Sequence, residues 1–244
     1  MTLIIGVILP NGVLLVSDTR GTSSITGEVD SDFRKKILSV TPYVDIAGSG
    51  AESNWHASKI LRDCLYNTVF LNPARYSKFE VRNEILKLYN GVNNLYQTNH
   101  PNGYPIGELL VAELDQATST FNLLRRCGLE GFTEFNVLSN VKDVEVIGSS
   151  SEVQCKVKKE VRLALENVPQ EIIHRKGGYI YIVDLCHEII KKQQDKSIGK
   201  NIYISYLTRN EKNGMPQHCL LFIKEDGTEY SCENDGLEEI KCEE

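Results

Sequence analysis

The amino-acid sequence predicts an α+β protein in which two stacked sheets lie between outer helices, an α-β-β-α sandwich. Two observations support this prediction. The strand-like segments are apolar at nearly every position rather than at alternate positions, a pattern typical of strands that are covered on both faces. The helix-like segments form two separate pairs, each flanked by strands, so that each pair can cover the outer face of one sheet.

The chain begins with two predicted β-hairpins. Residues 3–9 and 13–17 are apolar runs joined by Pro10-Asn11-Gly12, and Asn-Gly is a strong hairpin signal. Residues 36–40 and 43–47 form the second pair of strands, again with a short turn between them. Both pairs are therefore predicted to be antiparallel.

Amphipathic periodicity then predicts two helices, with Pro73 in the break between them. In the first helix the apolar residues recur at spacings of three and four along one face: Ala57, Ile60, Leu61, Cys64 and Leu65. The second helix has its apolar face at Val81, Ile85, Leu88, Val92 and Leu95. Such a stripe is typical of a helix that buries one side.

The rest of the chain predicts strands, two more helices and two closing strands. The strands are expected at residues 108–113, 120–125, 133–137, 144–147, 201–207 and 219–224. The third helix opens at Ser151, which can form a capping box with Gln154. The fourth has an apolar face at Ile182, Leu185, Cys186, Ile189 and Ile190. We predict one domain over residues 1–224, followed by an acidic, solvated tail, residues 225–244.

Charge and composition argue against several functional classes. The net charge of −6, with no Lys/Arg-rich run that stands out, argues against nucleic-acid binding. The first apolar run is interrupted at residues 10–12, well short of membrane-spanning length. The seven cysteines form no C-x-x-C pair and the five histidines show no metal spacing, so neither a cofactor nor a metal is expected. A cytoplasmic protein with reduced cysteines is the predicted class.

Thr2 is the first candidate for chemistry. Removal of Met1 would leave a threonine that carries both a hydroxyl and a free α-amine. The pKa of such an amine is about 7.7–8.0, so that much of it is an uncharged base at cellular pH. The amine can take the proton of the neighbouring hydroxyl, which activates a weak oxygen nucleophile.

Five further segments follow Thr2 in a fixed order. They are SDTRGT (17–22), KKI (35–37), IAGSGA (46–51), PIGELLVA (105–112) and VIGSSS (146–151). Together with Thr2 they resemble the corresponding segments of the proteasome-type N-terminal nucleophile (Ntn) threonine hydrolases. The resemblance is closer to the simple bacterial and archaeal members, which mature by loss of methionine, than to eukaryotic β-subunits.

The resemblance implies a role for each matching residue. Thr2 is the nucleophile, and Lys36 lowers the pKa of its hydroxyl by a nearby positive charge. Asp18 pairs with Lys36, the Gly48 N–H stabilises the oxyanion, and Ser149 hydrogen-bonds the Thr2 amine. On the residues alone, Gly48 could equally be a tight-turn glycine and Ser149 a helix cap.

Two assignments stay open. Lys35 competes with Lys36, because a slip of one residue reverses which side chain of a strand faces inward. Asp195 and Ser197, which by resemblance complete the shell around the Thr2 amine, are two positions apart here. The family places them three apart, before a Gly-Gly pair, so a plain loop role is the alternative for both.

The resemblance implies a cytoplasmic N-terminal-threonine peptidase, an amide hydrolase that forms an acyl ester on Thr2 and resolves it with water. It also implies a peptide or protein substrate and a homo-oligomeric ring or stack, whereas nucleic acid and membrane are not expected partners. If an amine took the acyl group from Thr2 in place of water, the protein would be a transpeptidase or peptide ligase. A retained Met1 would leave Thr2 inert, as in a non-catalytic structural subunit.

Overall fold

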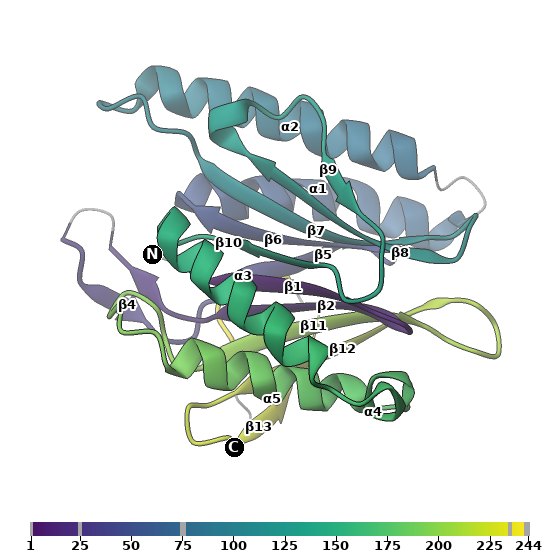
Figure 1. Cartoon of the computed structure of the whole chain (residues 1–244). Helices are drawn as coiled ribbons and strands as arrows, with labels where there is room; N and C mark the ends of the chain where they lie inside the picture. The colour runs from purple at the N-terminus through teal and green to yellow at the C-terminus, as the bar shows by residue number, and fades with distance from the viewer. Residues whose placement is uncertain (1, 24–25, 74–76, 234–235, 242–244) are drawn as a thin grey trace.

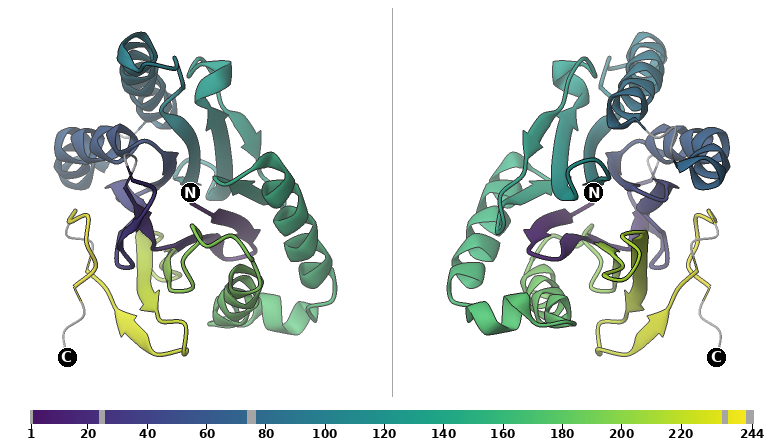
Figure 2. Two further views of the ribbon diagram at one scale, coloured as in Figure 1. Left: turned by 90° about the vertical axis from the view of Figure 1, so that its left-hand side faces the viewer. Right: turned by 90° about the vertical axis from the view of Figure 1, so that its right-hand side faces the viewer.

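The structure contains helices and antiparallel sheets, which confirms the α+β class. It is a computed structural model that describes residues 2–23, 26–73, 77–233 and 236–241. Two sheets lie against each other, with helices on their outer sides (Figures 1 and 2). Within the described ranges no helix combines the length and the apolar character needed to cross a membrane.

The larger sheet has six strands in the order β10-β1-β2-β11-β12-β13, and every neighbouring pair is antiparallel. Its strands are β1 (Ile4–Leu9), β2 (Gly12–Asp18), β10 (Val144–Ile147), β11 (Ile202–Arg209), β12 (Pro216–Ile223) and β13 (Glu229–Ser231). The hairpin predicted around residues 10–12 is confirmed, because Leu9 pairs with Gly12 across the turn.

The smaller sheet has five strands in the order β5-β6-β7-β8-β9, also antiparallel throughout. Its strands are β5 (Ile37–Thr41), β6 (Val44–Gly50), β7 (Gly107–Asp115), β8 (Thr120–Cys127) and β9 (Asn136–Leu138). A separate short hairpin, β3 (Gly21–Thr22) with β4 (Val29–Ser31), stands beside the sheets and was not predicted.

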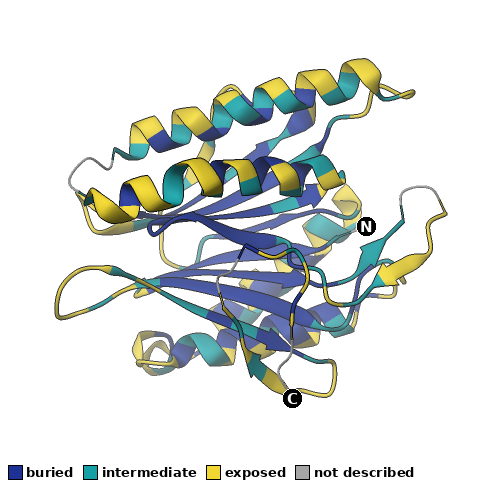
Figure 3. Cartoon of the chain, turned by 180° about the vertical axis from the view of Figure 1, so that it is seen from behind, coloured by how far each residue is buried: buried dark blue, intermediate teal, exposed yellow. Residues whose placement is uncertain are grey.

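The helices occupy the positions that the periodicity predicts. They are α1 (Glu52–Leu71), α2 (Lys78–Asn99), α3 (Ser151–Glu166) and α5 (Gly178–Lys191), with the short α4 (Gln170–His174) and a 3-10 turn (Gly128–Glu130) in addition. In Figure 1, α1 and α2 lie along the smaller sheet, and α3 and α5 lie along the larger one. Figure 3 shows that the helices bury their inner sides and expose their outer sides.

β1 lies in the middle of this arrangement, and its side chains alternate between two apolar clusters. Ile4 and Ile8 pack with residues of the smaller sheet, α1 and α2. Ile5 and Val7 pack with residues of α3 and α5. Because successive side chains of a strand point to opposite faces, a strand with both faces covered must be apolar at every position. This is the physical reason for the continuous apolar pattern of the sequence.

The predicted inner faces of α1 and α2 are partly wrong. Ile60 in α1 is 50% exposed and Leu95 in α2 is 68% exposed, whereas the polar Asn54 and Ser58 of α1 are buried. The Ser58 hydroxyl lies 2.6 Å from the hydroxyl of Tyr89 in α2. Buried polar groups are tolerated when they are hydrogen-bonded, and a purely apolar stripe therefore misplaces the buried face.

The third helix begins where predicted, but with a different cap. The Ser150 hydroxyl accepts a hydrogen bond from the Val153 N–H (3.3 Å), so that Ser150 is the N-cap and Ser151 the first helical residue. Gln154 does not close a capping box with Ser151. Its side-chain amide donates instead to Glu108 in β7 (2.8 Å), which ties the helix to the smaller sheet.

The described residues after position 224, which are 225–233 and 236–241, do not form a solvated tail, contrary to the prediction. They first form β13 and then return alongside residues 33–35, where the Lys35 N–H donates to the Glu238 carbonyl oxygen (2.7 Å). The Ile240 N–H donates to the Phe33 carbonyl oxygen (2.8 Å), and Ile240 is only 6% exposed. Residues 236–241, the C-terminal segment, therefore pack against the body of the protein.

Candidate functional site

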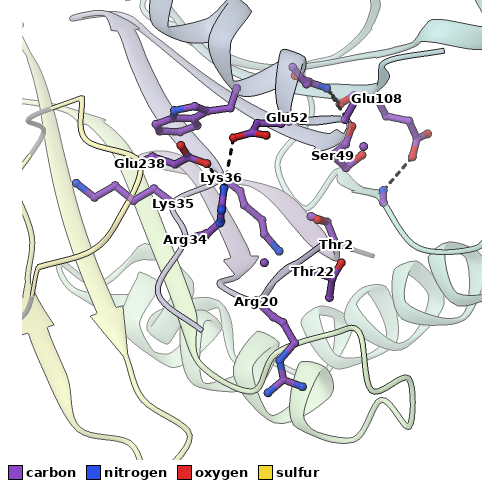
Figure 4. Close-up of a pocket in the computed structure, with 18 of the residues that line it drawn as sticks. Thr2, Arg20, Thr22, Arg34, Lys35, Lys36, Ser49, Glu52, Glu108 and Glu238 are labelled. Atoms are coloured by element: carbon purple, nitrogen blue, oxygen red, sulfur yellow. Dashed lines mark hydrogen bonds and ion pairs between the residues drawn. The ribbon is translucent and has the colours of Figure 1, made fainter. Parts of the chain in front are cut away.

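A cavity of about 630 Å³ opens at the end of the molecule where β1 begins. Its walls come from the β3–β4 hairpin, the end of β6, the start of α1, the turn before α3 and the C-terminal segment (Figure 4). Four of the predicted residues, Thr2, Lys36, Gly48 and Ser149, line it. The topology thus brings together side chains that are widely separated in the sequence.

Thr2 is partly buried, and only Leu3 separates it from the start of β1. The next residue is fixed by two hydrogen bonds, from the Leu3 N–H to Asp18 Oδ1 (2.8 Å) and from the Asp18 N–H to the Leu3 carbonyl oxygen (3.1 Å). On the other side, a Cβ at Gly148 would lie 2.1 Å from the Thr2 carbonyl oxygen, so only glycine permits this approach. Thr2 is therefore held between β2 and the turn that precedes α3.

The Asp18 carboxylate lies behind the cavity wall and is completely buried. Its Oδ1 accepts from the Leu3 N–H and from Lys36 Nζ, both at 2.8 Å. Its Oδ2 accepts from the Gly199 N–H (3.0 Å) and from the Arg20 N–H (3.2 Å). A buried carboxylate is costly unless it is paired and hydrogen-bonded, and these four contacts meet both conditions.

Lys36, not Lys35, faces the site. Lys36 Nζ lies 2.8 Å from Asp18 Oδ1, and Figure 4 shows the side chain extending toward Thr2. The Lys35 side chain runs in the other direction, where its Nζ donates to the Glu233 carbonyl oxygen (3.3 Å). Neighbouring residues in extended chain point to opposite sides, so only one of the two lysines can reach Asp18.

Burial is the largest influence on the Lys36 ammonium. It lowers the pKa of Lys36, against the charge and the hydrogen bond of Asp18, which act to raise it. The side chain is only 9% exposed. Because little water screens this ammonium, its field acts strongly on groups in the neighbouring cavity.

The Gly48 N–H is already used inside the sheet. It donates to the Lys36 carbonyl oxygen (3.0 Å), which removes the donor that the resemblance assigns to the oxyanion. A Cβ at Gly48 would lie 2.4 Å from Asn54 Oδ1, so a larger residue here would force the Asn54 side chain to move. Every second N–H of a strand points the same way, and the next one on this side belongs to Gly50, which lines the cavity. Gly50 has φ +112°, a conformation that favours glycine.

Ser149, Asp195 and Ser197 form a group beside the turn that precedes α3. Burial opposes ionisation of Asp195, but hydrogen bonds from the Ser197 hydroxyl (2.5 Å) and N–H (2.9 Å) outweigh it and lower the pKa of Asp195. Ser149 lies near enough to contribute to this lowering. No hydrogen bond of normal geometry reaches the buried Ser149 hydroxyl from the described part of the chain. Neither Asp195 nor Ser197 lines the cavity itself.

Glu108 is a site residue that the sequence did not reveal. Its Oε2 accepts from the Gly148 N–H (2.9 Å) and from Gln154 (2.8 Å), and its Oε1 accepts from Arg125 (2.7 Å). It therefore holds the turn that carries Ser149 against β7. In the sequence, Glu108 is simply a charged residue at the start of a strand, and no local pattern connects it with residues 40 positions away.

Charged side chains of both signs line the cavity: Asp30, Glu52, Glu108, Glu238, Arg20, Arg34, Lys35 and Lys36. Arg20 is engaged outside the cavity, because its Nε lies 2.6 Å from Asp32 Oδ1 and its Nη1 donates to the Lys196 carbonyl oxygen (2.7 Å). Among the residues that the structure describes, no group of three or more His, Cys, Asp or Glu side chains could hold a metal ion. The lining offers a bound molecule both acidic and basic groups.

Comparison with known proteins does not assign the chain to a family. No protein-family model matches the sequence, and no curated protein matches it significantly. The resemblance to the Ntn hydrolases therefore rests on Thr2 and the five sequence segments after it, and it stays a prediction.

Proposed function

We propose that the protein is an N-terminal-threonine peptidase, an amide hydrolase that acts after Met1 is removed. The observation that carries the proposal is the Lys36–Asp18 ion pair, in which Lys36 lines the same cavity as Thr2 and Asp18 lies behind its wall. Desolvating two charges costs free energy, so such a pair is a poor device for stability alone. It is well suited to hold a cation beside a reacting group.

The layering of the molecule supports the same proposal. One apolar cluster joins the two sheets to α1 and α2, and a second joins the larger sheet to α3 and α5. We propose that these layers form the four-layer Ntn sandwich. In that arrangement Thr2 stands at the open end of a central strand, where a substrate can reach it.

The proposed reaction needs only groups of this chain and water. The Thr2 oxygen attacks the carbonyl carbon of an amide, and its proton passes to the Thr2 α-amine. The Gly50 N–H stabilises the negative oxygen of the tetrahedral intermediate, an interaction worth about 2.7–4 kcal/mol in other enzymes. The amine then gives the proton to the leaving nitrogen as the C–N bond breaks, which leaves an acyl ester on Thr2. Water cleaves the ester by the same route and restores the hydroxyl.

The buried groups around Thr2 fit separate parts of this reaction. The Lys36 ammonium favours the deprotonated form of the Thr2 hydroxyl during attack. In this scheme the Ser149 hydroxyl, with Asp195 and Ser197 beside it, orients the α-amine of Thr2. The Asp18 carboxylate keeps the Lys36 side chain in place through the 2.8 Å contact.

Intact-mass analysis with a β-lactone electrophile tests the proposal. We expect the natively expressed protein to lack Met1 and to gain one lactone adduct on Thr2. The Thr2→Ala variant should gain none. Thr22→Ala is the matched control, since Thr22 is the other threonine of the cavity lining, and it should be labelled like the wild type.

Two results would overturn this function. A retained Met1 without an adduct indicates a non-catalytic subunit, and labelling that persists in Thr2→Ala moves the nucleophile elsewhere. Incubation with a peptide and a second peptide amine separates hydrolysis from ligation, because only a ligase forms the joined product.

A further inference from the structure

The C-terminal segment builds one wall of the cavity. Its Glu238 lines the cavity and forms an ion pair with Arg34, two residues before Lys36 in the sequence. Two backbone hydrogen bonds hold the segment, from the Lys35 N–H to the Glu238 carbonyl oxygen (2.7 Å) and from the Ile240 N–H to the Phe33 carbonyl oxygen (2.8 Å). The buried Ile240 side chain anchors it in the core. Glu238 is therefore in a fixed position.

Three carboxylates surround Arg34 at this wall. Asp30 Oδ2 lies 3.1 Å from Arg34 Nη2, and Glu52 Oε1 lies 3.8 Å from Arg34 Nη1, on the same nitrogen that contacts Glu238. Three negative charges against one positive charge leave an excess of two negative charges. Figure 4 shows Arg34, Glu52 and Glu238 together on one side of the cavity.

The other cations of the lining do not cancel this excess. Lys36 is paired with Asp18, and Arg20 is paired with Asp32, both of which lie outside the lining. The Lys35 ammonium points away from Thr2, toward the Glu233 carbonyl oxygen. A positively charged group in this part of the cavity therefore meets unbalanced negative charge.

We propose that the C-terminal segment is part of the substrate site, where Glu238, together with Asp30 and Glu52, selects substrates that carry a positively charged side chain. The reaction of the selected substrate rests on the peptidase function proposed above. The preference of the cavity for a positively charged side chain does not depend on that function. Glu238 is a specificity-determining residue in this scheme, because it contacts the substrate side chain and not the reacting bond. The negative wall lowers the free energy of a bound cation and raises that of a bound anion.

Binding to the Thr2→Ala protein tests the proposal without any chemistry. Trp55 is the only tryptophan of the chain and lines the cavity, so its fluorescence reports occupancy. We expect an acetylated tripeptide amide ending in arginine to bind more tightly than the same peptide ending in norleucine, and the peptide ending in glutamate to bind most weakly. Adding Glu238→Gln should reduce the arginine-to-norleucine affinity ratio about three- to tenfold, because water partly screens the charge of this partly exposed carboxylate.

Two further variants keep the test decisive. Glu239→Gln removes an exposed carboxylate from the neighbouring position of the same segment, outside the lining, and should leave the ratio unchanged. Glu52 is in α1, outside the C-terminal segment. We therefore expect Glu52→Gln to lower the arginine-to-norleucine affinity ratio while the C-terminal segment is unchanged. The proposal is overturned if Glu238→Gln and Glu239→Gln give the same ratio as the parent, or if none of the peptides changes the Trp55 signal. A preference for arginine without any lactone adduct on wild-type Thr2 would leave the proposal standing and reject the peptidase.

Discussion

At the scale of single residues, the site depends on which of two adjacent lysines points inward. Lys36 reaches the buried Asp18 carboxylate, and Lys35 reaches the Glu233 carbonyl on the opposite side. The two side chains have the same chemistry, so only their direction separates their roles. That direction is fixed by the backbone hydrogen bond from the Gly48 N–H to the Lys36 carbonyl oxygen (3.0 Å), which sets the register where β5 begins.

Replacing each lysine by methionine therefore gives unequal results. We expect Lys36→Met to slow lactone adduct formation at Thr2 by at least about 100-fold, because the cation that favours the deprotonated hydroxyl is lost. Lys35→Met keeps that cation and should slow labelling far less. Time-resolved intact-mass analysis measures both rates, and urea unfolding of each variant verifies that the protein is folded. Equal losses in the two variants would contradict the assignment of Lys36.

At the scale of elements, a buried polar cluster joins the two sheets. Asp45 in β6 accepts from the Ser205 hydroxyl in β11 (2.7 Å), and its Oδ2 lies 3.3 Å from His218 Nδ1 in β12. The other ring nitrogen of His218 lies 2.9 Å from the Pro42 carbonyl oxygen. Burial opposes protonation of His218, but Asp45 outweighs it, so the pKa of His218 is raised above its usual value. The same contacts lower the pKa of Asp45 against its own burial.

This cluster predicts a pH-dependent contribution to stability. Folded His218 binds its proton more tightly than unfolded histidine, whose pKa is about 6.5. Its stabilising effect is therefore complete below about pH 6.5 and is lost as the pH rises through the raised folded-state pKa. We expect the difference in unfolding free energy between wild type and His218→Gln to be larger at pH 6 than at pH 9. Urea unfolding at both pH values measures it.

His56→Gln provides the control for this experiment, because the His56 side chain is 60% exposed. It should change the free energy of unfolding little at either pH. A His218→Gln difference that stays constant between the two pH values would show that the pair with Asp45 does not stabilise the fold by its charge.

At the scale of the whole molecule, the two sheets approach each other closely at β1. A Cβ at Gly6 would lie 2.7 Å from a methyl carbon of Leu123 and 2.8 Å from one of Leu110, both in the facing sheet. Both leucines are fully buried, so neither can move away without disturbing its own neighbours. The glycine thus sets the distance between the layers on which the placement of Thr2 depends.

Gly6→Val should therefore destabilise the protein by about 1–3 kcal/mol through overpacking. Gly91→Ala is the matched control, because nothing lies within 4 Å of a Cβ at this exposed position inside α2. It should stabilise by about 0.5–1 kcal/mol, since alanine favours a helix over glycine. Urea unfolding curves measure both changes. A neutral Gly6→Val would mean that the sheets are not packed as closely as described.

The four long helices, the longer strands of both sheets and their order along the chain follow from local sequence, because the apolar periodicity reflects how many faces of each element are buried. The short β3, β4, β13 and α4 do not show such a pattern and were not predicted. The two-sided apolar pattern of β1 and the stripe of α5 are read correctly from local sequence alone. The five segments after Thr2 also indicated four candidate residues of the site: Asp18, Lys36, Gly48 and Ser149.

The arrangement of these residues depends on long-range contacts of the folded chain. The tertiary structure turned Lys36 rather than Lys35 toward Asp18, engaged the Gly48 N–H in the sheet, and placed Glu108 and Glu238 in the cavity. Each of these outcomes depends on a contact between distant parts of the chain. The pairing of β5 with β6 sets the direction of Lys36, the Gly148 N–H donates to Glu108, and the C-terminal segment packs against residues 33–35. Local sequence carries no record of such pairings, because they arise from the free energy of the complete packed arrangement.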